Sequence, residues 1–117
     1  MKIGTFFGFE AAHVLPHHPG KCSRLHGHSY RLEIVVEGPL QHAGPAAGMV
    51  MDFGDLKAVV RRTVIDVLDH SDLNAAIPNP TAEEIAAWIW GHLERELPML
   101  HRVVLWETAT AYAAIER

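Results

Sequence analysis

The sequence predicts an α+β domain in which a four-stranded antiparallel sheet is covered on one face by two helices. Two patterns lead to this prediction. Four segments have the alternation or composition of strands, and two segments in the middle of the chain carry apolar residues at helical spacing. The order strand, strand, helix, helix, strand, strand is typical of an α+β domain. At 117 residues the chain fits one domain, residues 1–117, that can bury an ordinary core.

The first two strands are predicted from alternating residues. Residues 2–13 are rich in aromatic side chains, and every second residue from Ile3 to His13 belongs on one face. A loop rich in proline and glycine follows. Residues 26–37 alternate more cleanly, with charged residues on one face. The other face of this segment carries His28, Tyr30, Leu32, Ile34 and Val36. Both segments therefore read as half-buried strands.

Two helices are predicted after a loop rich in glycine and proline. Asp52 is a suitable N-cap for an amphipathic helix over residues 53–68. The sequence Thr81-Ala82-Glu83-Glu84 has the pattern of a capping box and opens a second helix, which Pro98 ends. The remaining residues predict two more strands, Arg102–Trp106 and Ala109–Ile115, with a turn near Glu107.

Composition excludes several classes of protein. The net charge of −4 argues against a nucleic-acid binder, which would normally carry a basic face. No stretch approaches the roughly 20 apolar residues of a membrane helix, and the first residues lack the pattern of a signal peptide. Cys22 is the only cysteine, so no intramolecular disulfide can form and a reducing compartment is the simpler assumption. We therefore expect a cytoplasmic protein.

Five of the nine histidines fall between residues 13 and 28. His26 and His28 are two apart in an extended strand, so their side chains leave the same face. If the first two strands form a hairpin, His13 lies beside them. Three neutral imidazoles suit Zn²⁺, and three protein ligands leave the fourth tetrahedral position for water or substrate. The sequence therefore predicts an open zinc site. The alternative is three unrelated core or surface histidines, which is the commoner state of a single histidine.

Cys22 precedes His26 by four residues, on a loop that we expect to pass over the metal. A thiolate near Zn²⁺ and imidazoles should have a depressed pKa, which would suit a base or nucleophile. The alternative is a small buried hydrophobic residue. Asp69 and His70 follow the first predicted helix, where the carboxylate could orient the imidazole for proton transfer. The alternative is that His70 only caps the helix C-terminus.

Glu107 lies where the third predicted strand ends and is followed by Thr108. A carboxylate there could accept two parallel hydrogen bonds from a ligand with adjacent N–H donors, such as a guanidine-like heterocycle. The alternative is an ordinary exposed glutamate in a turn.

Six blocks of sequence together point to one enzyme family. They are Phe9-Glu10-Ala11-Ala12-His13, Cys22-Ser23-Arg24-Leu25-His26-Gly27-His28, Gly48-Met49-Val50-Met51-Asp52-Phe53, Leu68-Asp69-His70-Ser71-Asp72-Leu73-Asn74, Pro80-Thr81-Ala82-Glu83 and Glu107-Thr108. In these blocks, which run in the family's order over nearly the whole chain, the sequence closely resembles the 6-pyruvoyltetrahydropterin synthase superfamily. The three residues between Cys22 and His26 resemble its 6-carboxytetrahydropterin synthase branch. The resemblance implies the tunnelling fold, or T-fold.

The resemblance also implies a reaction, conversion of 7,8-dihydroneopterin triphosphate to 6-carboxy-5,6,7,8-tetrahydropterin, acetaldehyde and triphosphate, which serves queuosine and 7-deazapurine biosynthesis. Zn²⁺ on the three histidines would bind the hydroxyls of the substrate side chain. Cys22 would remove a side-chain proton, and His70, oriented by Asp69, would shuttle protons. Glu107, with Thr108 beside it, would hold the pterin ring.

The triphosphate requires positive charge, for which Lys21 and Arg24 are the nearest candidates, with His17 and His18 on the same loop. Family members assemble as trimers or as dimers of trimers with sites between subunits, so the resemblance implies a homotrimer or homohexamer. Assembly would also close the open edges of the sheet.

Two positions depart from the family pattern, and they bear on the branch and not on the family. Ser29 stands where many members have asparagine after His-Gly-His, and Glu84 stands where asparagine often follows the Pro-Thr block. The nearest rival is a 6-pyruvoyltetrahydropterin synthase, which would use the same metal and base but stop after triphosphate elimination and rearrangement. A rival from another class is a non-catalytic module that binds pterin or zinc.

Overall fold

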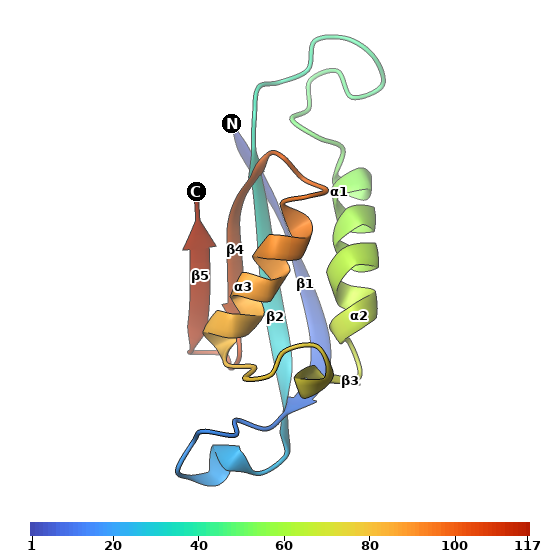
Figure 1. Cartoon of the computed structure of the whole chain (residues 1–117). Helices are drawn as coiled ribbons and strands as arrows, with labels where there is room; N and C mark the ends of the chain where they lie inside the picture. Colours follow the sequence, from blue (N-terminus) through green and yellow to red (C-terminus); the bar gives the residue numbers. More distant parts are fainter.

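The computed structural model describes all residues, 1–117, and contains one five-stranded sheet in the order β3-β1-β2-β4-β5 (Figure 1). The strands are β1 (Lys2–His13), β2 (His26–Glu37), β3 (Ser71–Asp72), β4 (Leu100–Trp106) and β5 (Tyr112–Glu116). The α+β class and the bounds of the first two strands are as predicted. The long hairpin of β1 and β2 is paired antiparallel from Lys2 opposite Glu37 to His13 opposite His26.

The sheet differs from the prediction in three places. The expected sheet had four antiparallel strands, whereas β3 adds a fifth, short strand that runs parallel to β1 at the edge. β4 begins two residues before the predicted strand Arg102–Trp106, at Leu100. β5 begins at Tyr112 rather than Ala109, because a turn occupies the intervening residues. In that turn the Thr108 hydroxyl accepts the backbone N–H of Ala111 at 3.1 Å.

The helix predicted over residues 53–68 is continuous but not uniform. It consists of α1 (Phe53–Val60), a π-helical segment η2 (Arg61–Ile65) and α2 (Asp66–Leu68). The Asp52 carboxylate caps it, accepting the backbone N–H of Gly54 at 2.7 Å. This side-chain bond satisfies one of the N–H groups that a helix start leaves without an intrahelical partner.

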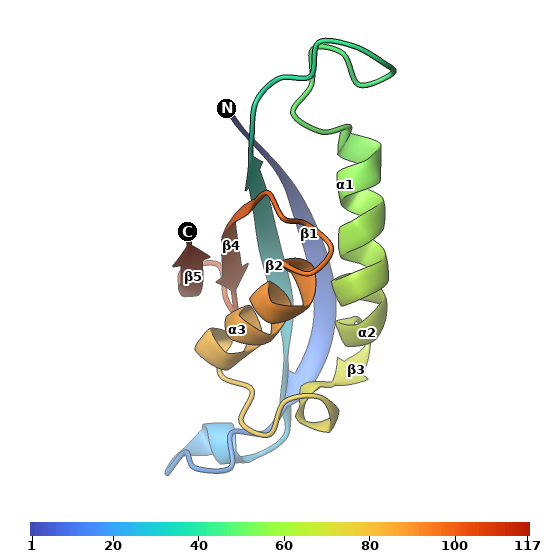
Figure 2. The same ribbon diagram turned by 45° about the horizontal axis from the view of Figure 1, so that its top comes forward.

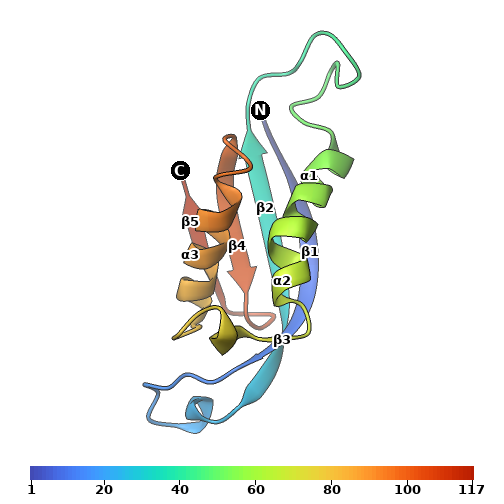
Figure 3. The same ribbon diagram turned by 45° about the vertical axis from the view of Figure 1, so that its right-hand side comes forward.

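The second helix, α3 (Ala82–Leu93), begins as predicted at Thr81, whose hydroxyl accepts the backbone N–H of Glu84 at 3.2 Å. The capping box is only half formed, because the Thr81 N–H donates to the carbonyl of Asn79 instead of to a glutamate side chain. Both helices cover the same face of the sheet, which leaves the other face open (Figure 2, Figure 3). None of the helices has the length and apolar character needed to cross a membrane.

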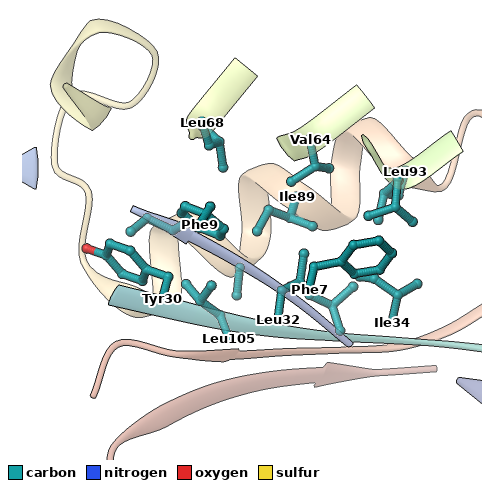
Figure 4. Close-up of a cluster of buried hydrophobic side chains, with 14 of the residues drawn as sticks. Phe7, Phe9, Tyr30, Leu32, Ile34, Val64, Leu68, Ile89, Leu93 and Leu105 are labelled. Carbon is teal, nitrogen blue, oxygen red and sulfur yellow. The ribbon is translucent and has the colours of Figure 1, made fainter. Parts of the chain in front are cut away.

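The core fills the space between the helices and the inner face of the sheet (Figure 4). Leu32 and Ile34 in the central strand β2 are fully buried, and Val64 of the first helix and Ile89 of α3 pack into the same cluster. Apolar side chains at alternate positions of β1 and β2 continue this core along the hairpin. At the end of the hairpin the inner face changes from apolar residues to histidines.

Candidate metal centre

Three histidines meet on the inner face where the β1–β2 hairpin ends. His13 is opposite His26 in the strand pairing, and His28 is opposite Ala11, one inward-facing position before His13. One ring nitrogen from each of the three lies within 4.8 Å of the others. The strand register therefore produces the convergence that the spacing predicts, and each side chain can offer one nitrogen to a common metal ion.

On two of these rings, hydrogen bonds occupy Nδ1 and leave Nε2 free to bind a metal ion. Nδ1 of His13 lies 2.7 Å from the carbonyl oxygen of Pro80, and Nδ1 of His26 lies 2.7 Å from that of Arg24. A carbonyl can only accept, so each Nδ1 carries the proton and each Nε2 presents a lone pair. The two Nε2 atoms are 3.0 Å apart. Two lone pairs facing each other at this distance fit a cation placed between them.

His28 completes the donor set. Its Nε2 is buried without a hydrogen-bond partner, although such atoms are normally paired. Burial lowers the pKa of His28, and the nearby imidazoles of His13 and His26 lower it further, while the charge of Glu107 opposes the shift. The neutral ring that a metal requires is thereby favoured. Three neutral imidazoles without a fourth protein ligand constitute an open metal site.

Glu107 lies beside the three histidines, at the end of β4. Its Oε1 is 3.9 Å from Nε2 of His28, and its side chain remains about a quarter exposed. Tyr30, one inward position beyond His28 on β2, is almost fully buried, and its hydroxyl lies 3.4 Å from Nδ1 of His13. Burial, with the negative charge of Glu107 as a second cause, raises the pKa of Tyr30 far above its ordinary value. Tyr30 is thus a neutral hydroxyl beside the metal ligands.

A pocket of about 440 Å³ opens next to Glu107. The pocket is lined by Leu15, by Thr81 and Glu83 at the start of α3, by Ala111 just before β5, and by Glu107. Most of its lining is apolar. Glu107 therefore faces both the metal centre and a cavity that can accommodate a flat organic ring.

Asp69 and His70 form the predicted pair, at the edge of the sheet beside β1. Nδ1 of His70 lies 3.0 Å from Oδ1 of Asp69, and the His70 ring is 79% exposed. The backbone N–H of Glu10 donates to the same Asp69 oxygen at 2.9 Å. This bond is the main cause that lowers the pKa of Asp69, and the hydrogen bond from His70 adds to it. Asp69 is therefore an ionised acceptor that orients the imidazole.

His70 does not cap the helix, which was the alternative. Its backbone has φ of +57°, beyond the helix end, and its N–H donates to the carbonyl of Glu10 on β1. Neither Asp69 nor His70 makes a hydrogen bond or ion pair with the three histidines, Cys22 or Glu107. Within one chain, the Asp69–His70 pair is thus separate from the three histidines, Cys22 and Glu107.

The loop with Cys22 projects beyond the end of the sheet (Figure 1). Cys22 is half-buried in the short 3₁₀ turn η1 (Lys21–Ser23), and its thiol is not among the groups that converge on the metal position. Lys21 and Arg24 are exposed on the same loop. The Arg24 carbonyl bonded to His26 ties the loop to the metal centre. The catalytic role of Cys22 and the phosphate contacts of the two cations stay predictions.

Sequence reasoning did not identify the groups that orient the metal ligands. The carbonyls of Pro80 and Arg24 fix two imidazoles, and main-chain carbonyls carry no signal in the side-chain pattern. Thr108 was expected beside the ligand, and its hydroxyl supports the turn after β4. Its contact with substrate remains a prediction.

Comparisons with known proteins identify the family and the fold of the chain. A family model described as 6-pyruvoyl tetrahydropterin synthase matches residues 2–117. The 6-carboxy-5,6,7,8-tetrahydropterin synthase of Synechocystis sp. is 50% identical over 111 residues, covering 92% of this chain and 86% of that protein. The dihydroneopterin monophosphate aldolase of Pyrococcus furiosus is 43% identical over 102 residues, covering 85% of this chain and 82% of that protein.

A solved structure shares the fold. The 6-pyruvoyl tetrahydropterin synthase of Caenorhabditis elegans superposes with a TM-score of 0.87 at 23% sequence identity, covering 100% of this chain and 95% of that one. The predicted T-fold class is confirmed, with the short additional strand β3 as the difference in strand count.

Proposed function

The chain belongs to the 6-pyruvoyl tetrahydropterin synthase family, and from that premise we propose that it is a 6-carboxy-5,6,7,8-tetrahydropterin synthase. The enzyme is a carbon–carbon lyase that converts 7,8-dihydroneopterin triphosphate to 6-carboxy-5,6,7,8-tetrahydropterin, acetaldehyde and triphosphate. The relative of that name at 50% identity supports this choice of branch. Its place would be queuosine or 7-deazapurine biosynthesis, in the cytoplasm.

The observation that carries the proposal is the position of Glu107. Its carboxylate lies 3.9 Å from the metal-ligand nitrogen of His28 and also lines the pocket of about 440 Å³. A pterin ring in that pocket can donate its amino group and ring N–H to the two oxygens of Glu107. The side chain of the pterin is then directed toward the three histidines, which is the geometry that the reaction requires.

We propose Zn²⁺ as the resident metal. The donor set of three neutral imidazoles matches its preference, and His13, His26 and His28 would hold it. When bound, Zn²⁺ acts as a Lewis acid that acidifies the hydroxyls of the substrate side chain. The carbonyls of Pro80 and Arg24 keep two of the rings in the tautomer that this role needs.

The chain's own residues supply the proton transfers. Cys22 takes a proton from the substrate side chain, since it lies on the loop that leads into His26. His70, oriented through Nδ1 by the ionised Asp69, leaves Nε2 free to accept and return protons as triphosphate departs and the carbon–carbon bond breaks.

Assembly into a homotrimer or homohexamer would complete the site. Asp69 and His70 lie at the β3 edge of the sheet, and they make no contact with the metal centre of their own chain. A neighbouring subunit that pairs along this edge would receive His70 at its own metal centre. Closure of the edge would also satisfy its unpaired backbone groups. We propose that Lys21 and Arg24 of the exposed loop contact the triphosphate, and that Thr108, near Glu107, contacts the pterin ring.

Product identification tests the proposed function. The zinc-loaded protein is incubated with 7,8-dihydroneopterin triphosphate, and the products are analysed by mass spectrometry together with an assay for acetaldehyde. We expect acetaldehyde and 6-carboxy-5,6,7,8-tetrahydropterin in equal amounts. A pyruvoyl product without acetaldehyde would reject the carboxy branch, and binding without turnover would favour the non-catalytic module.

Dihydroneopterin monophosphate is the matched control substrate. The relative at 43% identity is named as an aldolase for that compound, so a parallel incubation is informative. We expect the triphosphate to be consumed at least about ten times faster than the monophosphate, because charged contacts to the lost phosphates are worth about 1.5 kcal/mol or more. The reverse preference would favour aldolase chemistry.

A further inference from the structure

A second hollow lies on the open face of the sheet, at the same end of the hairpin. Its volume is about 570 Å³, and its polar lining includes Glu10, Ser29, His70 and Asp72. Glu10 and Ser29 are exposed and alternate with buried residues of β1 and β2, so their side chains point away from the helices. The hollow is therefore distinct from the pocket beside Glu107.

The hollow exists because two of the residues that line it are small. Ala12 and Gly27 are paired in the register next to Glu10 and Ser29, and both line the hollow. A Cβ atom on Gly27 would be 3.4 Å from its nearest neighbour, the carbonyl oxygen of Ala11, which is an ordinary contact. The packing of the chain itself does not require glycine there. The missing side chain is thus room available to a ligand.

Glu10 is fixed in this hollow from three directions. The Ser29 hydroxyl donates to its Oε1 at 2.8 Å. Its backbone N–H donates to Asp69 at 2.9 Å, and its carbonyl accepts the N–H of His70. Its Oε2 makes no hydrogen bond or ion pair within the chain. A held carboxylate with one free oxygen is a preorganised hydrogen-bond acceptor.

The charges around the hollow select the kind of group that it accepts. Glu10 and Asp72 contribute two carboxylates to the lining, which contains no lysine or arginine. Its basic residues are His28, which belongs to the three-histidine cluster, and His70, which is already bonded to Asp69. A phosphate would be repelled by these carboxylates. A hydroxyl or ring N–H would be a suitable donor to the free oxygen of Glu10.

We propose that Glu10 is a substrate-positioning residue, whose free carboxylate oxygen accepts a hydrogen bond from an uncharged part of the pterin substrate, across the hollow from His70. This proposal rests on the proposed function, in which His70 and the hollow face the metal centre of a neighbouring subunit. The triphosphate lies outside the hollow. Ser29 acts through Glu10 by holding its other oxygen.

The test measures binding of the two halves of the substrate separately, with 7,8-dihydroneopterin and inorganic triphosphate as probes in calorimetry on the zinc-loaded protein. Glu10→Gln keeps the size of the side chain and the acceptor for Ser29. We expect the Kd for 7,8-dihydroneopterin to rise about tenfold or more, whereas the Kd for triphosphate changes less than about twofold. Glu37→Gln is the matched control, because Glu37 lies on the same face at the other end of β2, and it should change neither constant.

Two variants of Ser29 separate positioning from a general structural effect. Ser29→Ala removes the hydroxyl that holds Glu10, and Ser29→Thr retains one. We expect weaker 7,8-dihydroneopterin binding for the alanine variant and near wild-type binding for the threonine variant, with melting temperatures alike. Unchanged 7,8-dihydroneopterin binding in Glu10→Gln would overturn the proposal. So would triphosphate binding that tightens more than in the Glu37→Gln control. Turnover of the wild-type protein tests the proposed function independently of these constants.

Discussion

The two halves of the β1–β2 hairpin share one geometry and differ in what they place on the inner face. Toward the closed core, the inward positions carry apolar residues such as Phe7, Leu32 and Ile34. Toward the open end, the same alternation places His13, His26 and His28. The strand pairing is continuous across both halves. The difference in role therefore arises from the side chains and not from the backbone.

A metal site can thus be built on the same two strands that carry the hydrophobic core. Apolar side chains are stabilised by burial alone and need no specific partner. Buried imidazoles need hydrogen bonds or a metal, since an unpaired polar group in the interior is costly. The carbonyls of Pro80 and Arg24 accept hydrogen bonds from two of the imidazoles. Nε2 of His28 has no such partner and remains available to a metal ion.

The largest effect is expected from His28→Ala, which removes one donor from the histidine half of the hairpin. Zinc content should fall from about one ion per chain to near zero, and activity should fall about 1,000-fold or more, because Lewis-acid stabilisation is worth several kcal/mol. Metal analysis and initial rates check this. Retention of stoichiometric zinc by this variant would contradict the assigned ligand set.

Cys22→Ala distinguishes a residue needed for catalysis from one needed for metal binding. Loss of the proposed base should lower turnover about 100- to 10,000-fold, while zinc content stays unchanged. The same two measurements apply. If zinc were lost along with activity, Cys22 would be a ligand and not the base.

Leu32→Ala tests the apolar half. Leu32 is fully buried in the central strand, so the cavity left by the substitution should lower the free energy of unfolding by about 2–5 kcal/mol. Denaturant unfolding measures this change. Zinc content and the rate per folded molecule should remain at wild-type values at low temperature. Leu25→Ala is the matched control, since Leu25 is 67% exposed and its loss should change stability by less than about 0.5 kcal/mol.

The smallest effect is expected from Asp69→Asn at low pH. Hydrogen bonds to the Asp69 carboxylate hold its folded pKa below the usual 3.8. Its contribution to stability is therefore fully present above that value and is lost as the pH falls through the lower folded pKa. The difference in free energy of unfolding between wild type and Asp69→Asn should not vary with pH near neutrality and should shrink below about pH 4. A difference that grows on acidification would contradict this assignment.

Long alternating segments made most of the fold predictable. The bounds of β1 and β2 follow from twelve-residue runs in which one face is apolar, and the caps at Asp52 and Thr81 mark both helix starts. The two-residue strand β3 carries no such pattern. It forms because the N–H of His70 finds the carbonyl of Glu10, a contact between residues far apart in the sequence. Such pairing is set by tertiary packing.

The site was predictable where it depends on strand spacing. The convergence of the three histidines follows from pairing and period two. The place of Glu107 at the end of a predicted strand drew attention to it, and it does lie beside the histidines. The position of Asp69 and His70 relative to the metal depends on how subunits meet, and a single sequence does not encode that in any local pattern. The hollow beside Glu10 could not be predicted either, because it is formed by the small side chain of Ala12 and the absence of one at Gly27.

X-ray absorption spectroscopy at the zinc edge, on protein loaded with one equivalent of Zn²⁺, tests the open three-histidine site most directly. We expect three imidazole nitrogens at about 2.0–2.1 Å from the zinc and one oxygen from water at a similar distance. A sulfur ligand at about 2.3 Å would place Cys22 on the metal and make the site a closed, structural one. That result, or failure to bind zinc at all, would contradict the account.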